Sequence, residues 1–285
     1  MINAIFEYRF LQNAMLAGIV ASIVCGIIGV IIVEKKLVMM SGGIAHTSYA
    51  GVGLGYFLGF EPIIGAFIFS VLAATGIYYL KKKAQARPDV SIGLFWSLGM
   101  ALGIIFIALT PGYPPDLNSY LFGNILSVTR TDLYMTGGLA AFVVLAVSLF
   151  YNHWKAYLFD DEFAGVLGIK TSFLGYLLYI LTAMTVVALI KVVGIILVLA
   201  LLLAPSAISG LFCEKLFSRM ICSIIFGIIF CIGGLWFSYA ANISSGASIV
   251  IISVLCCAAA YAVRNLTVFR RKKEAKNEQL KPERS

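Results

Sequence analysis

The chain is a series of long apolar stretches separated by short polar segments. Each stretch is about as long as the 20 residues that an α-helix needs to cross a bilayer, and the ten-residue alternation of a membrane β-barrel does not occur. The pattern therefore predicts an all-α polytopic membrane protein. The expected spans are residues 13–33, 39–59, 63–80, 90–110, 131–151, 173–190, 193–211, 220–239 and 247–263.

Charged residues in the polar segments predict the orientation. The strongest internal basic loop, Lys81–Arg87, and the cluster Arg270–Lys273 are expected on the cytoplasmic side, because basic loops stay inside. This rule gives nine crossings with the N-terminus outside and the C-terminus inside. Eight crossings fit nearly as well, because the loop around Lys35 is weakly basic and residues 173–211 form either two spans with Lys191 at the outer turn or one long bent element.

The remaining segments divide the chain into three parts. Residues 1–12 are expected to form an interfacial segment, residues 13–263 one transmembrane domain, and residues 264–285 a basic, disordered cytoplasmic tail. Residues 117–128 are too short to cross the membrane. We expect them to form a short outer or re-entrant helix that other helices bury.

Composition supports the membrane class: 61% of the residues are hydrophobic, 12% are charged, and the mean hydropathy is +0.99. The net charge of +8 comes from loop and tail clusters, which does not indicate a nucleic-acid partner. No nucleophile, base and orienting group stand together, and Gly165–Thr171 lacks the glycine that a nucleotide-binding loop needs before its lysine. We predict no enzyme activity; if ATP drives the protein, a separate subunit must hydrolyse it.

The stretch 39–59 carries His46, one of two histidines in the chain. Three glycines at four-residue spacing form a smooth stripe on its helix, which lets another helix approach closely; a second stripe occurs in the first span. A polar, metal-capable side chain on such a helix indicates an intramembrane site. A plain packing helix whose histidine bonds a neighbour explains the pattern equally well. The stripes are Gly51, Gly55 and Gly59, and Gly18, Ser22 and Gly26.

Residues 158–169 form the second informative segment. Its carboxylates precede a short amphipathic run, which suits a helix N-terminus, and Gly168 is a natural stop. A short helix along the cytoplasmic face, acidic at one end, is expected to dock on a partner with a basic rim. An ordinary surface loop is the alternative. The residues expected to take part are Asp160, Asp161, Glu162, Phe163, Gly165 and Gly168.

Five stretches, in order along nearly the whole chain, resemble the membrane permease of zinc/manganese-type ABC importers. These are Met40–His46, Asp116–Leu126, Phe159–Ile169, Val193–Pro205 and Ser245–Val250. The resemblance implies a homodimeric or closely related heterodimeric permease in the cytoplasmic membrane of a prokaryote. It also implies two cytoplasmic ATPases, an extracytoplasmic metal-binding protein, and a coupling helix at Phe159–Ile169 that docks into the ATPase. No permanently bound cofactor is expected; the metal is cargo, and ATP binds the partner.

The chain departs from that family at the expected metal site. An aspartate usually stands four residues before the histidine, where this chain has Gly42, and Asn242 replaces an acidic residue that is frequent near the outer turn. His46 is therefore the metal ligand that carries over, with Gly42, Asp116 and Asn242 assigned to the pathway or gate. Asp116 also suits a helix N-cap. The second protomer's His46, across the dimer axis, or alternatively Asp116 could compensate for the missing carboxylate.

The transported metal is expected to be zinc, with manganese next, because imidazole with few carboxylates favours zinc. An ABC permease for a metal chelate or a vitamin remains open and would not need His46. A secondary ion transporter is less favoured, because carboxylates are nearly absent from the spans. A purely structural membrane subunit is the last alternative.

Overall fold

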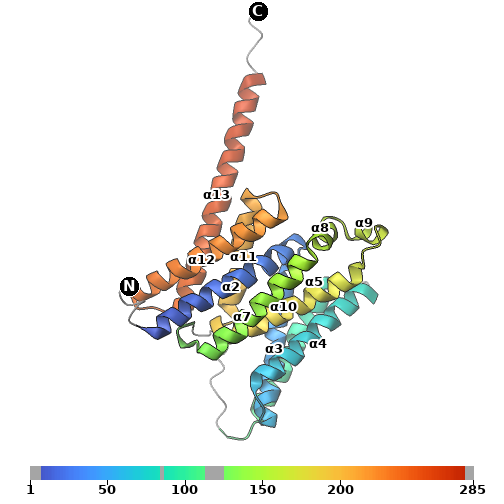
Figure 1. Cartoon of the computed structure of the whole chain (residues 1–285), viewed down its shortest axis with the longest axis vertical. Coiled ribbons are helices and arrows are strands. Elements are labelled where there is room, and N and C mark those ends of the chain that lie inside the picture. Colours follow the sequence, from blue (N-terminus) through green and yellow to red (C-terminus); the bar gives the residue numbers. More distant parts are fainter. Residues whose placement is uncertain (1–7, 84–86, 113–124, 280–285) are drawn as a thin grey trace, which may run out of the picture.

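The computed structural model describes residues 8–83, 87–112 and 125–279, with side chains through residue 267. The described residues form helices joined by short connections and contain no strand, so the all-α prediction is confirmed (Figure 1). The helices are α2 (Arg9–Glu34), α3 (Val38–Leu58), α4 (Pro62–Lys83), α5 (Pro88–Leu109), the short 3-10 helix η1 (Ile125–Ser127), α7 (Arg130–Leu149), α8 (Tyr151–Phe159), α9 (Asp161–Val166), α10 (Thr171–Val193), α11 (Ile195–Phe212), α12 (Leu216–Ala241) and α13 (Ser245–Gln279).

Eight of these helices are long and apolar enough to cross a membrane: α2, α4, α5, α7, α10, α11, α12 and the first part of α13. The 21-residue α3 has the length of a span but contains a histidine, several hydroxyl side chains and five glycines, which lower its hydropathy. Most of its residues are buried, because α4 and α5 cover it. The fold is that of a polytopic membrane protein, with α3 as an internal helix of spanning length.

The region 173–211 is two helices rather than one bent element. α10 ends at Val193 and α11 begins at Ile195, with only Gly194 between them. Gly194 has φ +83°, a conformation that glycine adopts without a steric penalty. Lys191, in the last turn of α10, pairs with Asp132 of α7 at 3.2 Å. The two-span alternative with Lys191 near the turn is therefore confirmed.

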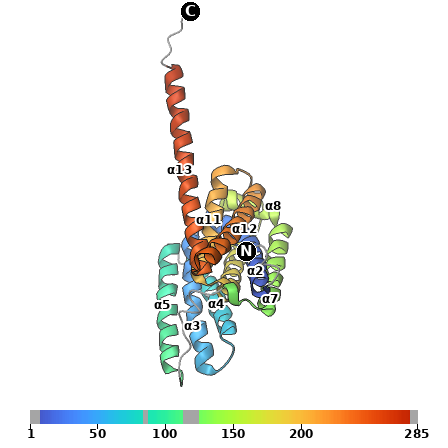
Figure 2. The same cartoon turned by 90° about the vertical axis from the view of Figure 1, so that its left-hand side faces the viewer.

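Three boundaries differ from the sequence-based predictions. Residues 9–12 form the first turn of α2, while residues 1–7 of the predicted interfacial segment lie outside the described residues. The tail predicted to be disordered from residue 264 instead continues α13 to Gln279, which projects beyond the other helices (Figures 1 and 2). The physical reason is that residues 247–281 contain neither glycine nor proline to end the helix. Of the predicted outer helix 117–128, only residues 125–128 are described, and 125–127 form η1.

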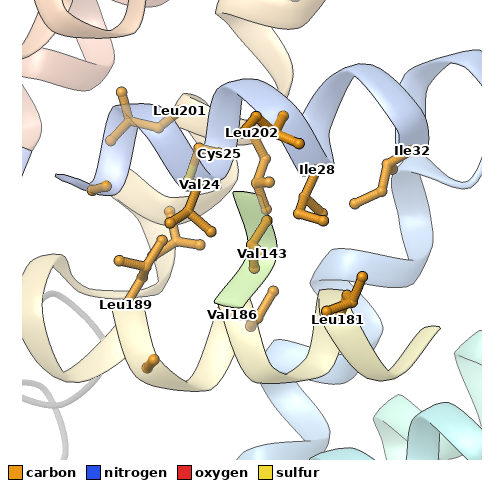
Figure 3. Packing of buried hydrophobic residues seen from close by; sticks show 14 of the residues in the cluster. Val24, Cys25, Ile28, Ile32, Val143, Leu181, Val186, Leu189, Leu201 and Leu202 are labelled. Carbon is orange, nitrogen blue, oxygen red and sulfur yellow. The ribbon is translucent and has the colours of Figure 1, made fainter. Parts of the chain in front are cut away.

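A continuous buried core runs through most of the described helices, and Figure 3 shows the part between α2, α10 and α11, with α7 at its side. Aliphatic side chains from these helices interdigitate in the close-up view. Inside lipid such a core gains little from the hydrophobic effect, because lipid tails are equally apolar, so van der Waals contact supplies its stability. The side chains labelled there include Val24, Ile28, Val143, Leu181, Val186 and Leu202.

Both predicted small-residue stripes lie at close helix contacts. A Cβ at Gly51 would collide with the backbone of Gly65 in α4, and one at Gly55 would lie 2.7 Å from Cα of Pro62. The contact is therefore backbone against backbone, as the sequence predicts. Gly59 lies outside the contact and ends α3 in a left-handed conformation. The stripe of α2 packs on α12: Gly18 faces Cys231, Ser22 faces Gly227, and Gly26 faces Ile224.

Candidate functional site

Helix α3 lies against α5 along much of its length (Figure 2). Four glycines on the two helices set the separation, since a Cβ on each of these four would meet the opposite helix at 2.7 Å or less. Thr47 of α3 also donates a hydrogen bond to the carbonyl of Phe95 in α5 at 3.1 Å. These contacts leave the two backbones little freedom to slide. The glycine contacts are Gly43 with Ile92, Gly53 with Gly103, Gly99 with Thr47, and Gly103 with Tyr49.

His46 projects from α3 onto the indole ring of Trp96 in α5. The two rings are nearly parallel, with an interplanar angle of 7° and centroids 4.3 Å apart. Both side chains are half-buried, and Nδ1 of His46 is buried without a hydrogen-bond partner among the described residues. The alternative of a histidine that is satisfied by a neighbouring hydrogen bond is not supported at Nδ1. A buried nitrogen without a partner is uncommon and calls for an explanation; five other buried side-chain atoms of the described residues share this property.

Gly42 lies one helical turn before His46 and faces the same indole. A Cβ at Gly42 would meet one described atom within 4 Å, Cζ3 of Trp96 at 3.8 Å, which is ordinary contact. Gly42 is buried, yet the space beside it would accept a small side chain. The structure thus brings His46 and Gly42 together beside Trp96. The sequence gives no local sign of Trp96, because it lies 50 residues away on another helix.

The other predicted pathway residues do not join this cluster in the described part of the chain. Asp116 lies outside the described residues. Asn242 ends α12 in a left-handed conformation (φ 55°), and its backbone N–H donates to the carbonyl of Ser238. Asparagine tolerates this conformation, so helix termination accounts for its geometry, and its pathway role stays a prediction. Across the described ranges, no three His, Cys, Asp or Glu side chains converge as a metal site would require.

The segment 158–169 forms the end of α8, the short helix α9 and a turn. Asp160 is the N-cap of α9, and its carboxylate accepts hydrogen bonds from the backbone N–H groups of Glu162 and Phe163 at 2.9 and 3.0 Å. Gly168 has φ +79° and follows the end of the helix, as the sequence predicts. Phe163 is 56% exposed. The helix thus presents acidic and aromatic groups on its surface, and its docking role stays a prediction.

Ion pairs connect this segment to the ends of other helices. Nζ of Lys35, just after α2, lies 3.6 Å from a carboxylate oxygen of Asp161 and 4.0 Å from the ring centre of Tyr157. Burial lowers the pKa of Lys35, and the Asp161 carboxylate acts in the opposite direction. Nearby, Arg219 of α12 pairs with Glu34 of α2. The sequence places these residues in loops of one side but does not pair them.

A groove of about 700 Å³ opens beside α9 at this end of the molecule. Aromatic side chains from α8, α9 and α12 line it, together with charged groups of both signs. The groove and the exposed face of α9 form a continuous surface, because Phe163 belongs to both. Its lining includes Tyr151, Phe159, Phe163, Phe217, Lys155 and Glu214.

Residues 7–264 match one family model, described as the ABC 3 transport family. The chain belongs to the ABC 3 transport family. It is 36% identical over 259 residues to the manganese transport system membrane protein MntC of Halalkalibacterium halodurans, covering 91% of this chain and 89% of that protein. It is 31% identical to the chelated iron transport system membrane protein YfeD of Yersinia pestis, covering 90% and 86%.

A solved structure supports the same assignment. PsaBC from Streptococcus pneumoniae, in complex with Fab, matches with a TM-score of 0.81 and 34% identity, covering 91% of this chain and 94% of that chain. This ABC 3 chain is thus a metal ABC importer permease and a multi-pass protein of the prokaryotic plasma membrane, as the resemblance implies. A permease of this family is a transport subunit and not an enzyme. The secondary-carrier and structural-subunit alternatives are set aside.

Proposed function

We propose that this permease imports manganese. The observation that carries the proposal is the likeness, over nearly the full length of both chains, to a protein named for manganese transport. The sequence favoured zinc, because His46 is an imidazole without the usual aspartate. A lone imidazole, however, is not a complete ligand set and selects no metal by itself. Zinc therefore remains the alternative cargo, to be compared directly with manganese.

In the proposed mechanism, an extracytoplasmic metal-binding protein delivers the ion to a pathway beside α3. His46 contacts the ion in transit, and a second protomer completes the ligand set. Two separate ATPase subunits supply the energy. The support is the half-buried position of His46 between tightly packed helices and its unpaired Nδ1. A site shared between two protomers suits transport, since a movement of one protomer against the other would separate the ligands and release the ion.

Uptake of radiolabelled manganese tests the proposal. The permease is reconstituted in proteoliposomes with its ATPase, and wild type is compared with His46→Ala. We expect ATP-dependent manganese uptake in wild type and a loss of roughly 10-fold or more in the variant, the scale of losing a metal contact. His153→Ala, in α8 on the cytoplasmic side, is the matched control and should transport normally. Uptake of zinc in preference to manganese would overturn the choice of metal.

A second proposal concerns the ATPase. We propose that α9 and the adjoining groove dock the ATPase, with Phe163 as the central contact. Aromatic anchors at the centre of an interface commonly contribute about 2 kcal/mol or more. Phe163→Ala is therefore expected to weaken the affinity for the ATPase roughly 30-fold, measured by titrating the purified ATPase onto detergent-solubilised permease. Phe237→Ala in α12, which is 50% exposed, is the control. Equal affinities for both variants would contradict the proposed docking site.

Chelated iron is the second candidate cargo, and the likeness to YfeD favours it. The same vesicles distinguish it from manganese. Uptake of radiolabelled iron as a chelate, unaffected by His46→Ala, would support a pathway that accommodates the chelator and does not bind a bare ion at the imidazole. Manganese uptake that competes with free iron but not with the chelate would support the primary proposal.

A further inference from the structure

Metal-binding histidines are normally held in place through their second ring nitrogen. That nitrogen donates to a carboxylate, a backbone carbonyl or water, which fixes the ring orientation and raises the basicity of the ligand. Nδ1 of His46 is buried, and none of the described residues is its hydrogen-bond partner. Position 42, one turn earlier, is a glycine and offers no side chain to the imidazole. Among the described residues, Nδ1 therefore has no hydrogen-bond acceptor that could orient the ring.

The indole of Trp96 has the geometry for that task. Its plane lies 7° from the plane of the imidazole with a centroid distance of 4.3 Å, so the two rings are stacked. Its Cζ3 atom also extends to 3.8 Å from the Cβ position of Gly42. The indole therefore lies both against His46 and in front of the open space beside Gly42. A larger side chain at position 42 would compete with it for that space.

The two backbones hold the stack from both sides. One turn before Trp96, Ile92 packs directly on Gly43, and three residues after it Gly99 packs on Thr47, with its Cβ position 2.5 Å from Cα of Thr47. Thr47 is the residue after His46 and bonds the Phe95 carbonyl, next to Trp96. These contacts lie on both sides of the stacked rings along the helices, and they cannot be broken unless α3 and α5 separate. Its geometry follows from the helix packing and is set before any ion arrives.

We propose that Trp96 is a positioning residue for transport: its indole orients His46 toward the passing metal ion in place of a hydrogen-bonding partner. Stacking fixes the ring without adding negative charge, so the imidazole lacks the support of a carboxylate and holds the ion less tightly than a carboxylate-supported histidine would. Such a ligand favours release, which a transport pathway needs. This inference rests on the proposed function, in which His46 contacts the metal.

The dependence of the uptake rate on the manganese concentration provides the first test. Initial rates of manganese uptake are measured over a range of concentrations for wild type, Trp96→Leu and Trp96→Phe. Leucine fills space but has no ring, so we expect the KM for manganese to rise roughly 10-fold, as for the loss of an orienting partner, with the maximal rate and the basal ATP hydrolysis retained. Phenylalanine keeps a flat ring and should retain the wild-type KM. Trp236→Leu in α12, where the side chain is 58% exposed, is the control for losing a tryptophan.

Either of two uptake results would overturn the inference. An unchanged KM in Trp96→Leu would mean that His46 needs no indole. Equal defects in Trp96→Leu and Trp96→Phe would mean that the volume of the indole, and not its stacked ring, is what matters.

Fluorescence separates this inference from the proposed function, because it needs neither ATP nor the ATPase. Mn²⁺ alone is titrated into the purified permease, and tryptophan emission is recorded for wild type, Trp96→Phe and His46→Ala. A paramagnetic ion beside the stack should quench part of the wild-type emission, and that part should disappear in both variants. If the wild-type complex imports no manganese but shows this quenching pattern, the proposal of manganese import is wrong, and the inference that Trp96 positions His46 is retained. If His46-dependent uptake occurs while Trp96→Phe retains the full quenching, the inference fails and the import proposal stands.

Discussion

Two regions of this protein hold helices together in different ways. Between α2, α10 and α11, aliphatic side chains such as Ile28 and Leu202 interdigitate and are fully buried (Figure 3). Between α3, α4 and α5, glycines remove the side chains and the backbones meet directly, as at Gly51 and Gly65. Side-chain packing tolerates small rotamer adjustments, whereas two touching backbones do not. The His46–Trp96 stack lies in the second region, where several glycines set the helix separation; in the first region Gly29 makes a similar contact with the backbone of Leu202.

The largest expected effect comes from adding one methyl group to the backbone contact. Gly51→Ala places a Cβ against the carbonyl of Gly65, so α3 and α4 must separate along their shared length. We expect a loss of about 3 kcal/mol in unfolding free energy, at the upper end of overpacking costs, measured by denaturation in detergent. Gly93→Ala in α5 is the control, because a Cβ there meets no described atom within 4 Å. A smaller loss of unfolding free energy for Gly51→Ala than for Ile28→Ala, the change described next, would contradict the comparison.

The corresponding change in the aliphatic core shortens a buried side chain. Ile28→Ala leaves a cavity between α2, α10 and α11, where the wild-type side chain is fully buried. We expect a loss of about 2 kcal/mol, the low end for such truncations, because the apolar detergent or lipid reduces the transfer contribution and leaves the lost van der Waals contacts. Ile229→Ala, where the side chain is 54% exposed, should have almost no effect on the same denaturation curve. Equal losses at both isoleucines would show that the core is loosely packed.

The smallest effect should have the opposite sign. Gly42→Ala lies on the same helix as Gly51, but its Cβ would meet only an ordinary contact with Trp96 in the described structure. Replacing a helical glycine reduces the entropy lost on folding, so we expect a gain of about 0.5–1 kcal/mol. The pair Gly42→Ala and Gly51→Ala therefore tests close packing within a single helix. Destabilisation at both positions would show that the space beside Gly42 is needed as well.

Local patterns in the sequence predicted much of the fold. The length of the apolar stretches predicted the helices, and the spacing of the glycines predicted the close contacts at Gly51 and Gly55. Both signals depend on residues within a few helical turns. The α10–α11 boundary stayed ambiguous, since the apolar run continues through it and only the conformation of Gly194 separates the helices. The extension of α13 was missed because charge composition was taken to indicate disorder, whereas the absence of glycine and proline permits a helix.

The candidate site was predicted only in part, for a different physical reason. His46 is conspicuous as a histidine in an apolar stretch, and Asp160 as the start of a short helix. Their partners are tertiary: Trp96 meets His46 across 50 residues, and Lys35 meets Asp161 across more than 100 residues. Such contacts follow from how the helices pack, which no local pattern specifies.

The length of α13 determines how far the chain extends beyond its predicted membrane span. Residues 245–267 are apolar enough to cross the membrane, and residues 268–279 continue the same helix for about 18 Å at 1.5 Å per residue. The C-terminal part of α13 therefore projects beyond the ends of the other helices (Figure 1). A complex of two protomers would have two such helical extensions. Any protein that approaches this face must fit beside or between them, so α13 limits the shape of what can dock there as well as anchoring the chain.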